Sequence, residues 1–141
     1  MTEFDDGYFQ NFDFSPEQIK KYWESAIKDL NIARRAEEPE VKFQFAYNAF
    51  IKLGITLIAE SGMRAKSRMG HHLKIIEKMS EILKDKDILA IGNQIRKARN
   101  TELYGGGIVM SKKQADDYLD FVMSASKKAR EIIKKQLNPL F

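Results

Sequence analysis

Arginine, asparagine and tyrosine residues cluster near position 100, in the segment of the sequence best equipped for chemistry. A helix over residues 93–104 would place Arg96 and Arg99 on one ridge. Asn100 and Tyr104 fall on the neighbouring ridge. Guanidiniums donate paired hydrogen bonds to phosphate oxygens, an amide fixes orientation, and a phenol stacks on a base. This face suits a phosphate, although spacing alone favours a solvated helix face whose arginines pair with carboxylates.

A second basic segment runs from Arg64 to His72 and contains Arg68 just before an expected helix start. Free backbone N–H groups and the helix dipole favour an anion at such a start. Adjacent histidines on a helix point about 100° apart. His71 and His72 therefore do not clamp one metal ion together, and the sequence has no other histidine. One of them is expected to cap or pack, and the other to transfer protons if the segment folds over the arginines.

Other catalytic and cofactor-binding patterns do not stand out. The run from Gly105 to Gly107 lacks the strand-before-helix context of a phosphate loop, so we interpret it as a helix terminator. The serines have no evident histidine and acid partners, and the acids show no paired catalytic spacing. The absence of cysteine excludes disulfides, thiolate zinc sites and a cysteine nucleophile. We expect neither a metal ion nor a cofactor.

Five expected helices position these groups in an all-α, up-and-down bundle. The second is apolar around much of its circumference, which is typical of the central helix, and Gly54 inside it permits close packing. Capping residues predict helix starts at Ser15, Asp87 and Ser111. No stretch alternates like a strand, and residues 63–70 are expected to form a loop. The expected helices cover Pro16 to about Arg35, Glu37 to Gly62, His71 to about Lys84, Asp87 to Gly105, and Ser111 to Asn138.

The bulk properties are those of one folded domain. The 141 residues suit a single core, with 43% hydrophobic and 31% charged residues. Residues 1–14 form an acidic and aromatic N-terminal segment, and residues 15–141 form the bundle. The net charge of +4 is only a weak pointer to a polyanionic partner. The start of the chain does not resemble a secretory signal, and no apolar run approaches a membrane span, so we expect a cytoplasmic protein without membrane contact.

Several segments together resemble HEPN domains, helical bundles often found beside minimal nucleotidyltransferases. Four expected elements resemble HEPN domains. They are the fourth helix with the glycines that follow it, the long capped helix after that, the second helix, and the basic loop with the start of the third helix. These segments are Ile95–Gly106, Asp116–Val122, Phe45–Gly62 and Arg64–Ile76. The resemblance spans roughly Ser15 to Leu137. It implies binding of RNA or a nucleotide, in a toxin–antitoxin or nucleotidyltransferase-associated system.

HEPN ribonucleases carry an arginine, often a polar residue after it, and then a histidine four to six residues later. Arg99 and Asn100 match the first two places, but Tyr104 occupies the histidine place. A phenol with a pKa of about 10 is a poor proton-transfer group at neutral pH. Binding with weak or no metal-independent RNA cleavage is therefore expected, with Arg99, Asn100 and Tyr104 as the catalytic residues if cleavage occurs. The candidate binding residues are Arg96, Arg99, Asn100, Tyr104, Arg68, His71 and His72.

The resemblance also implies a homodimer whose two arginine helices face one cleft. Ile108, Val109 and Met110 come after the glycines and are expected to form an exposed contact surface. The alternative is that these apolar residues fold back onto their own bundle. A second functional hypothesis is a non-catalytic interaction subunit that partners a nucleotidyltransferase or itself. A third places His71 or His72 as the proton-transfer group of an enzyme.

Overall fold

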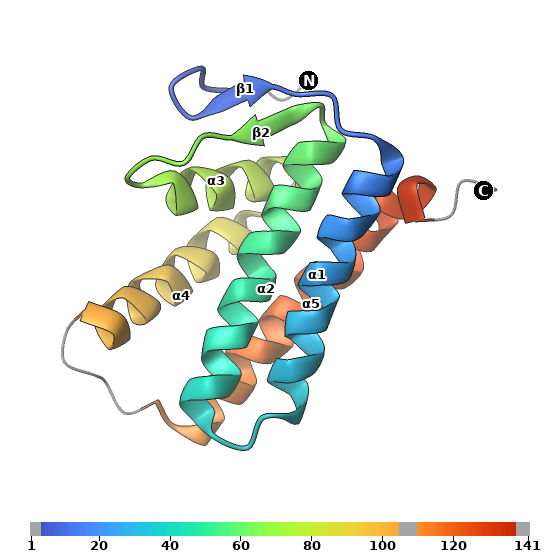
Figure 1. The fold of residues 1–141 in the computed structure, drawn as a ribbon. Helices are drawn as coiled ribbons and strands as arrows, with labels where there is room; N and C mark the ends of the chain where they lie inside the picture. Colours follow the sequence, from blue (N-terminus) through green and yellow to red (C-terminus); the bar gives the residue numbers. More distant parts are fainter. Residues whose placement is uncertain (1–3, 105–109, 138–141) are drawn as a thin grey trace.

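The chain is an all-α bundle of five helices, as the sequence predicts. The computed structural model describes residues 4–104 and 110–137, except for the side chains of 102–104. Within these residues no helix is both long enough and apolar enough to span a bilayer. The helices are α1 (Pro16–Arg35), α2 (Pro39–Glu60), α3 (His71–Leu83), α4 (Lys86–Tyr104) and α5 (Lys112–Leu137), as shown in Figure 1.

Helix α2 is the centre of the bundle and contacts all four other helices. Helices α1 and α5 pack along α2 and against each other, while α3 and α4 form a hairpin that packs on α2 separately (Figure 1). The buried side chains of α2 include Phe43, Ala49, Ile51 and Leu53, which lie on several sides of the helix. Its apolar circumference is thus explained by neighbours on several sides.

Two predicted capping boxes are present, and one predicted cap is wrong. The hydroxyls of Ser15 and Ser111 accept hydrogen bonds from the backbone three residues later, and the glutamine at that position reaches back in each case. Helix α4 instead begins at Lys86, one residue before the predicted cap. Asp85 accepts a hydrogen bond from the backbone N–H of Asp87 at 3.0 Å, so Asp85 is the residue that caps α4.

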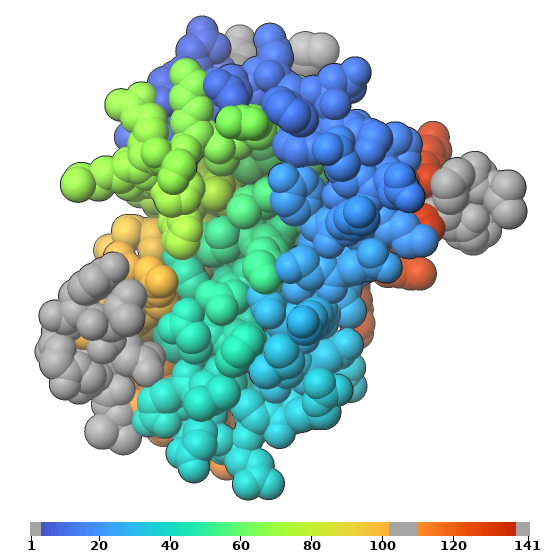
Figure 2. Space-filling view, in the orientation of Figure 1, coloured from blue at the N-terminus to red at the C-terminus, as the bar shows by residue number. Residues whose placement is uncertain are grey.

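A short antiparallel strand pair was not predicted. Strand β1 (Phe9–Asn11) pairs with β2 (Met63–Ala65), with Phe9 opposite Ala65. Residues 63–65 are therefore strand rather than the predicted loop. The sequence did not indicate this strand because three residues are too few to show alternation of apolar and polar side chains. Phe9 is buried in the core, so the N-terminal segment packs on the bundle. Figure 2 shows this segment and the chain after α2 in contact over one end of the molecule.

The residues after the glycine run are only partly described. Met110 is 7% exposed and belongs to the core of the single chain. Its predicted place on an exposed contact surface is therefore wrong, and the alternative of folding back onto the bundle holds at this position. Ile108 and Val109 lie outside the described residues.

Glycines allow the α3–α4 hairpin to approach α2 closely. A Cβ atom at Gly54 would lie 2.5 Å from Cγ2 of Ile75 and 2.7 Å from Sδ of Met79, both on α3. A Cβ atom at Gly92 on α4 would lie 2.8 Å from Cγ2 of Ile76. The predicted packing role of Gly54 is confirmed.

We predict that Gly54→Ala destabilises the protein. Overpacking a core costs about 1–3 kcal/mol, whereas alanine gains about 1 kcal/mol over glycine in a helix. The branched Ile75 cannot swing away as a flexible side chain would, so a net loss is expected. Urea unfolding measures the difference, with Ser124→Ala on the exposed side of α5 as the control. An unchanged midpoint for both variants would contradict the close-packing argument.

A candidate phosphate-binding cleft

A cleft of about 340 Å³ lies between the start of α3 and the second half of α4. It brings together six of the seven candidate binding residues predicted from sequence. The seventh, Tyr104, is at the end of α4 and its side chain lies outside the described part of the chain. The lining consists of Arg68, Met69, Gly70, His71, His72, Leu73, Arg96, Arg99 and Asn100.

The α3–α4 hairpin explains why these residues meet. The two helices are joined by a turn at Lys84 and Asp85, with a left-handed φ of 53° at Lys84. The chain therefore reverses direction, and α4 runs back along α3 (Figure 1). The first turn of α3 then lies beside the later part of α4, so residues nearly thirty positions apart share one cleft.

A buried tyrosine contacts two of the residues that line the cleft. Tyr47 on α2 is 1% exposed, and its Oη lies 2.8 Å from Nδ1 of His72. The guanidinium carbon of Arg99 lies 5.4 Å from the centre of the Tyr47 ring, a cation–π contact. Sequence reasoning treated Tyr47 only as part of the apolar face of its helix. The missed signal was its hydroxyl, which needs a polar partner when buried.

The environment keeps both partners of this hydrogen bond neutral at neutral pH. Burial lowers the pKa of His72 from 6.5 to about 4, and the neighbouring charges of His71 and the arginines act in the same direction. Burial raises the pKa of Tyr47 to about 12, although Arg99 and Arg96 oppose this shift. The phenol is the better donor of the two groups, which assigns its O–H as donor to Nδ1. The ring hydrogen of His72 is then on Nε2.

The two arginines of α4 are held without carboxylates. Nε and Nη2 of Arg96 both donate to Oδ1 of Asn93, at 3.1 and 2.9 Å. Nε of Arg99 is buried and has no hydrogen-bond partner. Among the described side chains, no carboxylate forms an ion pair with Arg96 or Arg99. The guanidiniums therefore keep donors available for an anion.

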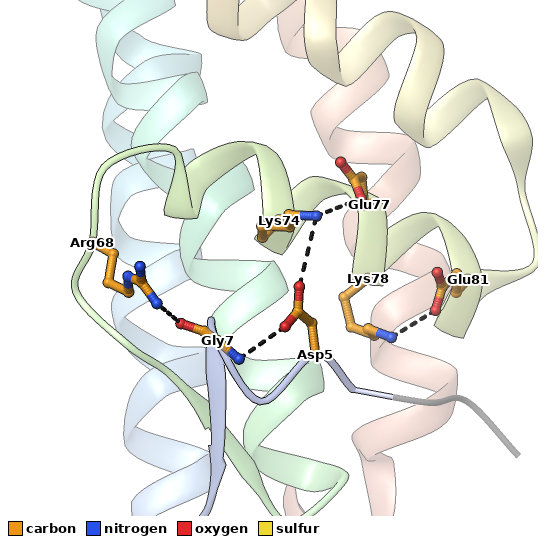
Figure 3. Close-up of polar contacts among 7 residues, drawn as sticks. All are labelled: Asp5, Gly7, Arg68, Lys74, Glu77, Lys78 and Glu81. Atoms are coloured by element: carbon orange, nitrogen blue, oxygen red, sulfur yellow. Dashed lines mark hydrogen bonds and ion pairs between the residues drawn. The ribbon is translucent and has the colours of Figure 1, made fainter.

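The N-terminal segment holds the basic loop against α3 (Figure 3). Nη1 of Arg68 donates to the carbonyl of Gly7, and its guanidinium carbon lies 5.2 Å from the centre of the Tyr8 ring. Asp5 accepts from the N–H of Gly7 at 2.8 Å and lies 4.0 Å from Nζ of Lys74 on α3. These contacts set the backbone position from which Arg68 reaches the cleft.

The two histidines have different surroundings. Nδ1 of His71 lies 2.7 Å from the carbonyl oxygen of Arg68, which closes the turn before α3. His72 points to the buried Tyr47, and the two imidazole centres are 4.6 Å apart. Within the described residues, no three His, Asp or Glu side chains are grouped so that they could hold a metal ion.

Comparisons with protein-family models, with curated proteins and with solved structures found no match for this chain. Its function is therefore inferred from the geometry of the cleft, and the HEPN resemblance remains an expectation from the sequence.

We predict that His72 makes the stability of the protein depend on pH. Its folded pKa lies below its ordinary value, so the unfolded chain binds the proton more readily. Stability should be complete above about pH 6.5 and fall as the pH drops towards 4. The His72→Asn variant keeps an acceptor near the Nδ1 position but does not titrate, and it should lose less stability over this interval. Urea unfolding at several pH values measures this, and equal slopes for both proteins would refute the assignment.

Proposed function

We propose that the chain is a HEPN-like module that binds the phosphate groups of RNA or a nucleotide in the cleft between α3 and α4. One observation carries the proposal: Arg68, Arg96 and Arg99 line a single cleft that no described carboxylate lines. Three like charges in one place repel each other, and an anion between them removes that repulsion. Phosphate is the anion whose oxygens best match the planar fork of arginine.

Each arginine has a distinct part in this proposal. Arg96 is oriented by Asn93, so little side-chain freedom is lost when it binds a phosphate. Arg99 rests on the Tyr47 ring and has an unsatisfied Nε. The first turn of α3 adds backbone N–H groups, since this helix has no side-chain cap. Asn100 lines the same cleft and supplies an amide to orient a ribose or Arg99.

We propose binding with weak or no cleavage. Tyr104 occupies the histidine place of the HEPN motif, and a phenol is a poor proton-transfer group at neutral pH. His72 and Arg99 both contact Tyr47, but Nδ1 of His72 is already hydrogen-bonded there. An enzyme would have to use Nε2 of His71 or His72, and comparing RNA cleavage by wild type, His71→Asn and His72→Asn tests this.

We predict that Arg96→Ala with Arg99→Ala weakens binding of a short RNA by about tenfold or more, because hydrogen bonds to charged groups are lost. The dependence of affinity on salt should also flatten, by about one phosphate contact per arginine. Lys97→Ala is the control for charge, since it removes one positive charge, half of that lost in the double variant, from an exposed position on α4 outside the cleft. Fluorescence anisotropy over a salt series gives both quantities.

Equal affinities and salt slopes for wild type and the double variant would refute the proposed function. A loss that is the same in Lys97→Ala would show that only net charge matters, which also contradicts a built site. Circular dichroism of each variant verifies that the helices are retained.

We further propose a homodimer as the assembly in which the module acts, with two Arg99 side chains near one shared anion. Phosphate should then strengthen the dimer, because it offsets their repulsion. Sedimentation at tens of micromolar protein, with and without phosphate, measures the effect, and a monomer in both buffers contradicts the dimer. The interaction-subunit hypothesis predicts instead that a nucleotidyltransferase co-purifies with the chain and that RNA affinity is negligible.

A further inference from the structure

An aromatic groove lies beside the phosphate-binding cleft. Its volume is about 470 Å³, and its walls include the rings of Phe12, Phe14 and Tyr22. The centres of the Phe12 and Phe14 rings are 4.4 Å apart, and those of Phe14 and Tyr22 are 5.5 Å apart. The ring planes are inclined by 44° in the first pair and by 78° in the second. The three rings therefore form a row, set at angles to one another, that joins the segment after β1 to the first turns of α1.

The rings of this row are partly exposed to solvent, whereas aromatic side chains of a core are buried. Phe12 is 37% exposed and Tyr22 is 38% exposed, two of the few large hydrophobic side chains of the described chain in this state. The guanidinium carbon of Arg64 lies 5.1 Å from the centre of the Phe12 ring, so a flat cation is stacked at one end of the row. Flat rings with a stacked guanidinium are the surface on which nucleobases stack.

The groove adjoins the phosphate-binding cleft. His71 lines both of them. Ser67 lines the groove while Arg68, the next residue, lines the cleft. An extended ligand can therefore occupy both at once.

We propose that this aromatic groove is a subsite for an unpaired base of a nucleic-acid strand whose neighbouring phosphate occupies the arginine cleft. The proposal rests on the proposed function and adds that the ligand is single-stranded. A strand alternates flat bases with phosphates, and the protein places a row of flat rings next to a group of guanidiniums. An acidic peptide would supply anions but no flat ring beside each of them.

The groove offers stacking with little means of reading sequence. Polar groups at its edge come from Gln18, Arg64 and Ser67, which are flexible or small and can hydrogen-bond to several bases. Stacking tolerates any base because each has a π face, whereas a base inside a duplex is already stacked and paired. The module should prefer single strands over duplexes and discriminate weakly among sequences.

The test combines Phe12→Ala and Tyr22→Ala in the full chain. Three probes are compared: a labelled RNA strand of about eight nucleotides, within the site sizes of single-strand binders, an abasic strand of equal length, and the corresponding duplex. The double variant should lose about tenfold or more in affinity for the RNA strand, because stacking is lost. Its affinity for the abasic strand should not change. Leu89→Ala removes an equally exposed apolar side chain, 38%, outside the groove and is the control.

A Phe12→Trp variant gives a second measurement that does not depend on a loss of affinity or of stability. Its indole keeps the stacking surface, so affinity should be retained. Because Trp23 also fluoresces, the signal of the new indole is the excess over wild type, and the RNA strand but not the abasic strand should quench that excess. Any one of three results would overturn the base subsite. The double variant could bind RNA as wild type does, it could lose affinity equally for the RNA strand and the abasic strand, or the quenching could be absent. The proposed phosphate site is tested separately, by the Arg96 and Arg99 double variant and its Lys97→Ala control.

Discussion

The hydroxyl of Tyr47 is buried on the central helix, and a buried hydroxyl must be hydrogen-bonded to avoid a cost of about 1–3 kcal/mol. Its partner is Nδ1 of His72, which belongs to the first turn of α3. This bond fixes the start of α3 against α2 and the orientation of the imidazole. The same ring supports the guanidinium of Arg99 from α4. Three helices thus meet at one phenol, and the cleft exists because its walls are held there.

Local signals in the sequence predicted the helices well, and contacts between distant residues explain what was missed. The start of α1 is set by Ser15, Pro16 and Gln18, which act within one turn, and the structure has the same boundary. Strand β1 could not be recognised, since it pairs with a segment more than fifty residues away. The cap of α4 was placed at Asp87 because two aspartates in three residues offer the same signal, and only the turn at Lys84 selects Asp85.

In the candidate site too, local sequence signals were recognised and contacts between distant residues were missed. Residue types and spacing were enough to nominate the arginines of α4 and the histidines at the start of α3, because charge and chemistry are local properties. That they share a cleft depends on the reversal of the chain between α3 and α4 and on the close approach permitted by Gly54 and Gly92. Tyr47 escaped notice because most residues one turn away from it on α2 are apolar, so periodicity alone makes it another core residue. The partner that gives it a different role lies twenty-five residues away.

The unsatisfied Nε of Arg99 is the feature that a purely structural role leaves unexplained. A buried donor without an acceptor costs free energy, and native proteins keep few of them. If Arg99 only packed on Tyr47, an uncharged side chain of similar shape would do so without that cost. The neighbouring imidazole adds to this reasoning, because the surrounding positive charges help to keep His72 neutral. An anion in the cleft would supply the missing acceptor for Arg99, and its charge would offset the positive charges that lower the pKa of His72.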